Sequence, residues 1–396
     1  MSRDPGAAPV EASIVIVAWR LVNELQECLD ALAASINAPS FEVIVVLNGA
    51  SPDSAQIAMR HPVVSRVITR SSNVGFGAAC NLAASVAIGR NLIFLNDDTR
   101  VDRHWLASLV GASDAKNGKR AVASLLLNYD GSVQEAGSRL LSHGGTLQWG
   151  ANLTLTEAER DGLLEPRQID YGSGAALLVK RSDFEKVGGF DPIFEPAYFE
   201  DVDLQLRLRE IGVEVWLEPR AIVLHHSGRS TVSDHWFRQF AANRSGHRFI
   251  ERWTGVLATA PTSDDPVSKV CEIPIARRDV ARNPIDASTD DSALIALRIA
   301  HDYQDWLSTQ LDQLKELHVE ISADPNAPTR RELIDRLHLS TLRARELTIR
   351  LADVESRGVL GITKMRVGIG LKKLTSRFFK RAATNGWAKR GQSRSR

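Results

Sequence analysis

Two neighbouring aspartates, Asp97 and Asp98, follow directly after the apolar run Phe94-Leu95 and a single asparagine, Asn96. Adjacent carboxylates repel each other and are costly to bury. Their oxygens suit a hard divalent cation, and a cation shared with a diphosphate would relieve the repulsion. The pair therefore predicts a cation site or, more simply, a turn with two solvated acids at the end of a strand; taken alone, it favours the turn.

A second acidic group, Glu200, Asp201 and Asp203, stands in the sequence YFEDVD. The amphipathic pattern of residues 198–212 predicts a helix that begins at these acids. Acids in the first turn of a helix are favoured by the helix dipole, so they could serve as caps. One carboxylate in a cleft could instead act as a general base, and a neighbouring acid would raise its pKa.

Two further segments carry weaker signals. In SSNVGFGAACN, Gly75 and Gly77 precede a predicted helix, whose N-terminus favours an anion, although the segment matches neither the P-loop pattern nor G-x-G-x-x-G. It predicts a phosphate loop or an ordinary turn. His225 and His226 lie in LHHSGRST, and adjacent residues of a strand point in opposite directions. One of them would face a cleft, as a structural histidine or as a metal ligand beside an aspartate.

Strands and helices must bring these groups together. Short β-branched runs predict buried strands at residues 13–19, 41–47, 63–69 and 91–95. Helical patterns lie between them, near residues 23–35, 52–60 and 76–88. This alternation predicts an α/β fold with a parallel sheet covered by helices on both faces. Ligands bind such sheets beyond the carboxyl ends of the strands, where we expect the polar segments to converge.

Composition excludes several classes of protein. The chain has 396 residues, of which 43% are apolar, and a formal net charge of +1, so bulk charge does not steer it to nucleic acid. Its three cysteines lack a CxxC spacing and predict neither a disulfide framework nor a thiolate zinc site. The sequence has no pattern of a secretory signal or a membrane span, so we expect a cytoplasmic protein.

The composition changes after about residue 258. We expect five parts: a disordered N-terminus (1–11), one α/β domain (12–258), a linker (259–288), a helical hairpin or coiled coil (289–356) and a basic tail (357–396). The tail has twelve Lys and Arg residues and no acid. It predicts contact with an anionic membrane at its inner face, or a solvated tail. The helices favour a homo-oligomer, and no aromatic platform predicts nucleic-acid binding.

Eight segments occur in one order along the chain: SIVIVAW, VVLNGASPDS, NVGFGAACN, FLNDDT, DGSVQEAG, GSGAALLVKRSDFEKVGGFD, YFEDVDLQLRL and HHSGRS. Together they resemble the inverting glycosyltransferases of family 2. The resemblance implies the GT-A fold, a Rossmann-like mixed sheet flanked by helices, here with a C-terminal helical extension. Within the family, the segments are most similar to bacterial rhamnosyltransferase-like enzymes of cell-wall and O-antigen assembly.

The resemblance also implies roles for individual residues. Asp98 corresponds to the cation-binding carboxylate of the family's DXD motif, and His225 would lie near the metal. Asp201 corresponds to the catalytic base, with Glu200 and Asp203 orienting it or binding acceptor hydroxyls. Binding of the nucleotide sugar falls to eight residues: Trp19, Asn48, Asp53, Asn73, Gly75, Asn81, Asn96 and Asp97.

The implied reaction uses Mg²⁺ or Mn²⁺, a nucleotide-sugar donor such as dTDP-rhamnose, and a hydroxyl of a glycan or polyprenyl-linked acceptor. Asp201 would take the hydroxyl proton during a single inverting displacement. One alternative is a catalytically silent GT-A module that binds a sugar nucleotide or acts as a scaffold. Such a copy would tolerate loss of Asp98 or Asp201, whereas both are present in this chain. Another is a nucleotidyltransferase, which would need a glycine-rich loop where this chain has AWRLVNE.

Overall fold

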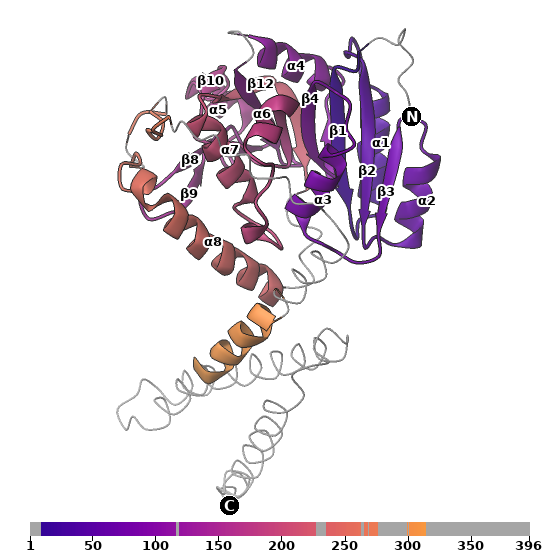
Figure 1. The fold of residues 1–396 in the computed structure, drawn as a ribbon. Coiled ribbons are helices and arrows are strands. Elements are labelled where there is room, and N and C mark those ends of the chain that lie inside the picture. Colours follow the sequence, from indigo (N-terminus) through magenta and orange to yellow (C-terminus); the bar gives the residue numbers. More distant parts are fainter. Residues whose placement is uncertain are drawn as a thin grey trace, which may run out of the picture. The chain divides into compact units, whose positions relative to one another are not determined.

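A mixed sheet of ten strands forms the centre of the protein (Figure 1). The computed structural model describes residues 9–115, 119–226, 235–262, 265–267, 269–275, 299 and 301–313. The strands of the sheet are β1 (Ala12–Ala18), β2 (Phe41–Asn48), β3 (Arg66–Arg70), β4 (Asn91–Asn96), β5 (Thr99–Val101), β6 (Arg120–Leu127), β7 (Val133–Glu135), β10 (Arg167–Gln168), β11 (Ala176–Lys180) and β12 (Glu214–His225). A separate hairpin joins β8 (Ser138–Leu140) to β9 (Thr146–Gln148).

The main path through the sheet has the strand order β10-β12-β6-β11-β4-β1-β2-β3. Strands β4, β1, β2 and β3 run parallel, as do β12 and β6, whereas β11 is antiparallel to both of its neighbours. The predicted mixed α/β sheet flanked by helices is confirmed. Strand β3 begins three residues later than predicted, because Pro62 and Val63 form a turn that is closed by a hydrogen bond from the N–H of Val64 to the carbonyl of His61.

Helices cover both faces of the sheet (Figure 1). They are α1 (Asn23–Ala33), α2 (Pro52–Arg60), α3 (Phe76–Ala84), α4 (Trp105–Asp114), α5 (Leu155–Arg160), α6 (Arg181–Lys186), α7 (Glu200–Glu210) and α8 (His235–Leu257), with a short 3₁₀ helix η2 (Pro192–Phe194). One apolar cluster joins the strands to α3, α6 and α7, and a second joins them to α1, α2 and α4. Neighbouring residues of one strand, such as Val15 and Ile16, enter different clusters, as expected for strands buried on both faces.

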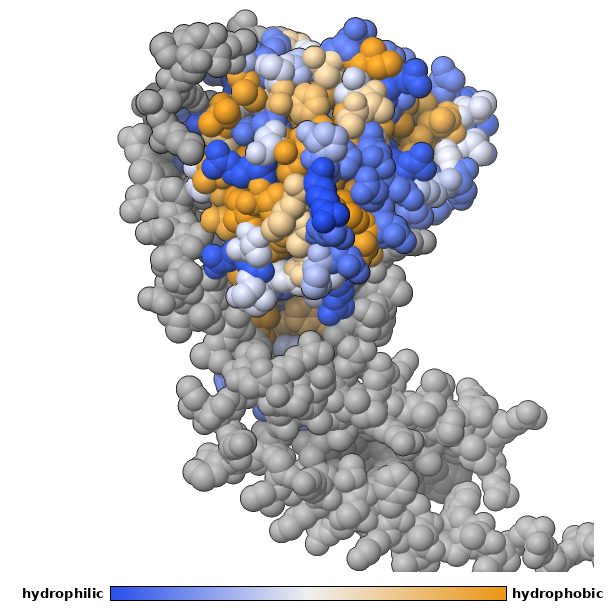
Figure 2. Space-filling view, turned by 90° about the vertical axis from the view of Figure 1, so that its right-hand side faces the viewer, coloured by the Kyte–Doolittle hydropathy of each residue, from blue (hydrophilic) through white to orange (hydrophobic). Residues whose placement is uncertain are grey.

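Strand β3 forms one edge of the sheet and carries arginines at both of its ends, Arg66 and Arg70. Charged residues on an edge strand oppose pairing with another chain. Figure 2 shows the side of the molecule on which β3 and α2 lie in Figure 1, where apolar groups are interspersed with hydrophilic ones. None of the helices within the described ranges is long and apolar enough to cross a bilayer.

Part of the predicted linker is bound to the domain. Arg139 is 1% exposed and donates hydrogen bonds to four backbone carbonyls, those of Thr262, Asp265, Pro266 and Lys269. Cys271 is also buried, and its N–H bonds the Asp170 carboxylate at 2.6 Å. The prediction of a linker from residue 259 is therefore wrong for this stretch, because buried polar groups of the domain use its backbone as their partner.

The chain divides into two compact units, residues 1–292 and 293–396. The second unit is described only at residue 299 and over 301–313, where the backbone is helical. The predicted second helix of the hairpin, the basic tail and most of the predicted N-terminal segment lie outside the described residues.

Candidate active site

Asp98 and His225 meet where β4 leads into β5 and where β12 ends. The backbone N–H of His226 bonds the carbonyl of Asp98 at 3.0 Å, and His225 pairs in register with Thr99. This pairing brings Nε2 of His225 to 3.2 Å from Oδ1 of Asp98. Both side chains are almost fully buried. The strand-end acid and one of the two histidines are thus neighbours, as the sequence predicted, and His225 is the one that faces Asp98.

Gln134 determines which nitrogen of His225 carries the proton. Its Nε2 donates to Oδ1 of Asn128 and to the carbonyl of His225, so its Oε1 is the atom that lies 2.7 Å from Nδ1 of His225. A carbonyl oxygen only accepts, so the neutral imidazole carries its proton on Nδ1. The lone pair of Nε2 therefore points toward Asp98. The sequence analysis did not single out Gln134, although it lies in the segment DGSVQEAG.

The pair of Asp98 and His225 has the chemistry of a cation site. Oδ1 of Asp98 is buried and has no hydrogen-bond partner within the described part of the chain. A carboxylate oxygen and an imidazole lone pair that face each other repel unless a proton or a cation lies between them. Both are good ligands for a divalent metal, so the residues fit one. No group of three His, Cys, Asp or Glu side chains suited to a metal is found in the ranges that the structure describes.

Asp97 turns toward the end of β1. Its Oδ2 accepts a hydrogen bond of 3.4 Å from the N–H of Trp19, which is half-buried and stacks under the guanidinium of Arg20. Burial, together with the charge of Asp98, raises the pKa of Asp97 well above its usual value. Asn96 lies beside the pair of Asp98 and His225, with its Nδ2 at 3.4 Å from Nε2 of His225. Trp19 and the NDD segment therefore border the same site.

Asp201 lies in the first turn of α7 and is held by backbone amides. Its Oδ2 accepts from the N–H of Gly174 at 2.7 Å, and its Oδ1 accepts from the N–H of Val202 at 2.8 Å. These bonds favour the ionised form, whereas burial raises the pKa of Asp201. Burial and the charge of Asp201 raise the pKa of Glu200 much further, and Oε2 of Glu200 has no partner among the described residues. The arrangement therefore favours an ionised Asp201 beside a protonated Glu200.

The chain enters α7 in an unusual conformation. Tyr198 and Phe199 both have a left-handed backbone, with φ of 73° and 67°. Each costs about 1–2 kcal/mol for a residue other than glycine. The cost is offset by contacts with α8: Ser245 Oγ bonds the carbonyl of Ala197 at 2.9 Å, and the rings of Phe199 and Phe249 lie 5.0 Å apart. Helix α8 thus helps to hold the loop that presents Glu200 and Asp201.

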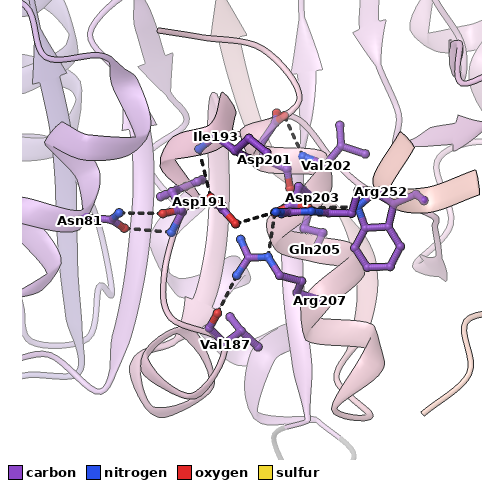
Figure 3. A network of polar contacts seen from close by, with 12 residues as sticks. Asn81, Val187, Asp191, Ile193, Asp201, Val202, Asp203, Gln205, Arg207 and Arg252 are labelled. Carbon is purple, nitrogen blue, oxygen red and sulfur yellow. Dashed lines mark hydrogen bonds and ion pairs between the residues drawn. The ribbon is translucent and has the colours of Figure 1, made fainter. Parts of the chain in front are cut away.

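Asp203 does not point into the site. It is fully buried and binds Nε of Arg207 at 2.7 Å, Arg252 at 2.9 Å and the indole N–H of Trp253 at 3.0 Å (Figure 3). Arg252 also bonds Asp191 at 2.8 Å, so this network joins α7 to α8 and to η2. In this structure the oxygens of Asp203 pair the buried Arg207 and the half-buried Arg252, and its implied role in orienting Asp201 or binding acceptor hydroxyls stays a prediction.

Comparison with known proteins agrees with this geometry. The profile described as Glycosyl transferase family 2 matches residues 13–188. An N-acetylglucosaminyl-diphospho-decaprenol L-rhamnosyltransferase of Mycobacterium tuberculosis is 31% identical over 261 residues, which cover 60% of this chain and 83% of that protein. The chain belongs to glycosyl transferase family 2. The predicted family and the predicted enzyme class, a glycosyltransferase, are confirmed.

Other relatives of this family 2 glycosyltransferase are more distant. The O-antigen biosynthesis protein RfbC of Myxococcus xanthus is 29% identical over 244 residues, which cover 59% of this chain and 18% of that protein. A solved structure of GalNAc-T7 with UDP, GalNAc and Mn²⁺ is 16% identical and has a TM-score of 0.48, over 65% of this chain and 50% of that one. That likeness is too low to say anything about the chemistry of this glycosyltransferase.

Several residues with an implied donor role are used by the family 2 domain itself. Asn48 donates to Oδ1 of Asn73 and to the carbonyl of Gly75, and accepts from the N–H of Val74 at 2.8 Å. Its amide shapes the loop at residues 73–75, and its implied role in binding the nucleotide sugar stays a prediction. Asp53 is exposed in the first turn of α2, where the helix dipole favours an acid.

Asn81 binds the backbone of Phe190 from both sides of its amide. Its Nδ2 donates to the carbonyl at 2.8 Å, and its Oδ1 accepts from the N–H at 2.9 Å (Figure 3). The amide of Asn81 thus holds α3 against the segment that leads to η2, and its implied role in binding the nucleotide sugar stays a prediction.

The N-terminus of α3 already holds a carboxyl group of the chain itself. Oε1 of Glu195 accepts from the N–H of Ala78 at 2.6 Å, and Glu195 is 3% exposed. A Cβ at Gly75 would lie 1.4 Å from Oε2 of Glu195, and a Cβ at Gly77 would lie 3.2 Å from Oε1. The two glycines thus make room for the carboxyl group of Glu195, and the implied role of Gly75 in binding the nucleotide sugar stays a prediction.

Proposed function

We propose that this glycosyltransferase is a cation-dependent inverting enzyme that moves a sugar from a nucleoside diphosphate to a hydroxyl group of a glycan. One observation carries the proposal: the Asp201 carboxylate is fixed by the N–H groups of Gly174 and Val202, beside a Glu200 whose pKa is raised much further. This arrangement favours an ionised Asp201 beside a protonated Glu200, and an ionised carboxylate is what a general base requires.

Asp98 and His225 would hold the divalent cation, Mg²⁺ or Mn²⁺. The cation would neutralise the negative charge that develops on the leaving diphosphate. Gln134 keeps the proton of His225 on Nδ1 and so leaves Nε2 free to coordinate. With two protein ligands, the site leaves coordination positions for water and for diphosphate oxygens. Asn96, Asp97, Trp19 and the loop at Asn73 would border the nucleotide sugar.

Asp201 would accept the proton of the acceptor hydroxyl while that oxygen forms a bond to the anomeric carbon. The bond from the anomeric carbon to the diphosphate oxygen breaks at the same time, and the diphosphate leaves with the electron pair. Attack from the face opposite the leaving group inverts the anomeric centre. A single base is sufficient, in contrast to the two carboxylates that flank the bond in a glycosidase. Protonated Glu200 would donate a hydrogen bond that orients the acceptor or the base.

The names of two relatives support a choice of donor and acceptor. One relative is named for transfer of L-rhamnose to a diphospho-decaprenol-linked N-acetylglucosamine, and another is named for O-antigen biosynthesis. We therefore propose dTDP-rhamnose as the donor and a polyprenyl-linked glycan as the acceptor, in cell-wall or O-antigen assembly. A cytoplasmic enzyme at the inner face of the membrane would meet such an acceptor. The basic tail and helices predicted for membrane contact and a homo-oligomer lie outside the described residues.

A donor screen tests the proposal. Purified protein is incubated with a panel of nucleotide sugars, a bacterial lipid extract, and either Mn²⁺ or EDTA, and release of nucleoside diphosphate is followed. We expect release from one donor with Mn²⁺, loss of release with EDTA, and loss in Asp201→Asn with donor affinity retained. Tight donor binding without release from any donor would contradict the proposal and favour a silent sugar-nucleotide-binding module.

A further inference from the structure

The turn Gly172–Ser173–Gly174 before β11 presents three successive N–H groups to three side chains. The N–H of Gly172 bonds Oε1 of Gln205 at 2.8 Å, that of Ser173 bonds Oε1 of Glu135 at 2.9 Å, and that of Gly174 bonds Oδ2 of Asp201 at 2.7 Å. Glu135 and Asp201, the proposed base, therefore accept hydrogen bonds from adjacent N–H groups of one turn. The sequence analysis gave no role to Glu135.

Close packing keeps this turn in place. A Cβ on Gly174 would lie 3.0 Å from Cβ of Asp201, and a Cβ on Gly172 would lie 2.1 Å from that of Ala123. Gln205 is fully buried, and its Nε2 donates to the carbonyls of both Gly172 and Asp201, at 2.7 and 2.9 Å. The turn and the first turn of α7 are thus joined, which fixes the two carboxyl groups relative to each other.

Glu135 is the last residue of β7 and is 4% exposed. Its neighbour Gln134 holds the imidazole of His225. The end of β7 therefore contacts both parts of the candidate site. Gln134 bonds His225 of the Asp98–His225 pair, and Glu135 bonds the turn that also holds Asp201. No other role is evident for a buried acid at this position, since a neutral glutamine could accept the same hydrogen bond from Ser173.

Several titratable groups surround the two acids. Burial, together with the charge of Asp201, raises the pKa of Glu135 to about 7. Tyr171 lies close enough for both acids to raise the pKa of its phenol, which is already raised by burial. The charge of Asp201 also raises the pKa of Glu200, which burial raises first. Interacting acids of this kind titrate as a group, so a change at one of them moves the apparent pKa of the others.

We propose that Glu135 is a positioning residue of the reaction: anchored beside Asp201 on the same turn, it sets the proton affinity of the base through its own negative charge. The inference rests on the proposed role of Asp201. Below the titration range of Glu135 the base has a neutral neighbour. Above that range Glu135 carries a second negative charge next to Asp201. This charge raises the affinity of Asp201 for a proton and so makes Asp201 a stronger base.

The first test is the pH dependence of kcat/KM in the full-length wild type, in Glu135→Gln and in Glu42→Gln. Glu42 is a matched control, because it is also a buried acid that accepts bonds from a hydroxyl and an N–H, of Ser13 and Ile88, at the opposite end of its strand from the site. Because Asp201 ionises before Glu135, Glu135 is neutral along the acid limb of Asp201, and its charge adds a second rise of kcat/KM near pH 7. We expect Glu135→Gln to lose this second rise, with KM for the donor unchanged, and Glu42→Gln to keep it. A second rise that persists in Glu135→Gln would overturn the proposal.

The second test needs no turnover, so it separates this proposal from the proposed activity. The side-chain carboxyl carbons are labelled with ¹³C and titrated by NMR, and the signals are assigned by their loss in Glu135→Gln and Asp201→Asn. We expect the apparent pKa of Glu135 to fall in Asp201→Asn, and the second step in the Asp201 signal, which follows ionisation of Glu135, to disappear in Glu135→Gln. Independent titration of the two groups would refute the inference even if the enzyme is active. Linked titration without any turnover would leave the inference on the pair intact and remove the proposed reaction.

Discussion

Nε2 of His225 lies 3.2 Å from Oδ1 of Asp98, and Gln134 accepts the hydrogen bond from the other nitrogen of the same ring. Three residues from β12, β7 and the end of β4 thus prepare one side of the site. In the proposed cation site, Gln134 would orient the ligand His225 without being a ligand itself.

Replacement of Gln134 by leucine should weaken cation binding. The ring of His225 would lose the acceptor that fixes its orientation and proton, and such losses reduce metal affinity by roughly 10–100-fold. Calorimetry of Mn²⁺ binding in the presence of a nucleoside diphosphate would measure the change. Gln148→Leu, at an exposed position of β9, is the matched control. Equal affinities in the two variants would show that Gln134 has no such role.

Replacement of Asp203 by alanine should strongly destabilise the fold. Arg207 and Arg252 would keep their charges in a buried place with one partner removed, at a cost of about 3–5 kcal/mol. Urea unfolding would measure the free energy. Glu185→Ala, which breaks an exposed pair with Arg181, should change it by less than about 1 kcal/mol. A small effect of Asp203→Ala would mean that water reaches the two arginines.

Glu195→Gln should become more stable relative to the wild type as the pH rises. Burial raises the pKa of Glu195 to about 8, so between about pH 5 and 8 the unfolded chain loses this proton while the folded chain retains it. The folded wild type is therefore penalised progressively, by up to about 1.4 kcal/mol per pH unit, and the glutamine variant is not. Unfolding at pH 5.5 and pH 8 would measure this, with the exposed Glu159→Gln as a control for loss of one charge. A stability difference that is constant with pH would contradict the assignment.

Arg139→Met should release the segment at residues 262–275. Four backbone carbonyls would lose their charged donor, and each such bond contributes about 1.5–3 kcal/mol. We expect trypsin to cleave after the exposed Lys269 at least about tenfold faster, as followed by mass spectrometry. Arg160→Met, at an exposed position of α5, should not change this rate. Unaltered cleavage in Arg139→Met would mean that other contacts hold the segment.

The regular parts of the fold could be predicted from the sequence because they follow local patterns. β-branched runs bounded by polar residues gave β1, β2 and β4, and their order placed Asp98 at the carboxyl edge of the sheet. The acids that begin α7 were evident from the amphipathic pattern after them. These signals are periodic and short in range, so they can be read from neighbouring residues alone.

The residues that were missed depend on partners that are far away in sequence. Gln134 matters through His225, 91 residues later, and Glu195 through Ala78, 117 residues earlier. Asn81 and Asn48 resemble ligand residues by type, but their amides satisfy the backbone of their own chain. The segment with residues 262–269 looked like a linker because its contact with the domain leaves no mark on its residue types. Arg139 bonds only backbone carbonyls there, and every residue type has one. Pairings of this kind leave no periodic pattern in the sequence.

The carboxyl group of Glu195 closes the end of α3 and fills the space that Gly75 and Gly77 leave. The domain thus places a carboxyl group of its own at a helix end that would otherwise be open to an anion. Substitution of Glu195 by a small neutral residue would empty the space beside the same two glycines, next to Asn73. A single substitution would then give this end of α3 room for an anionic group from outside the chain.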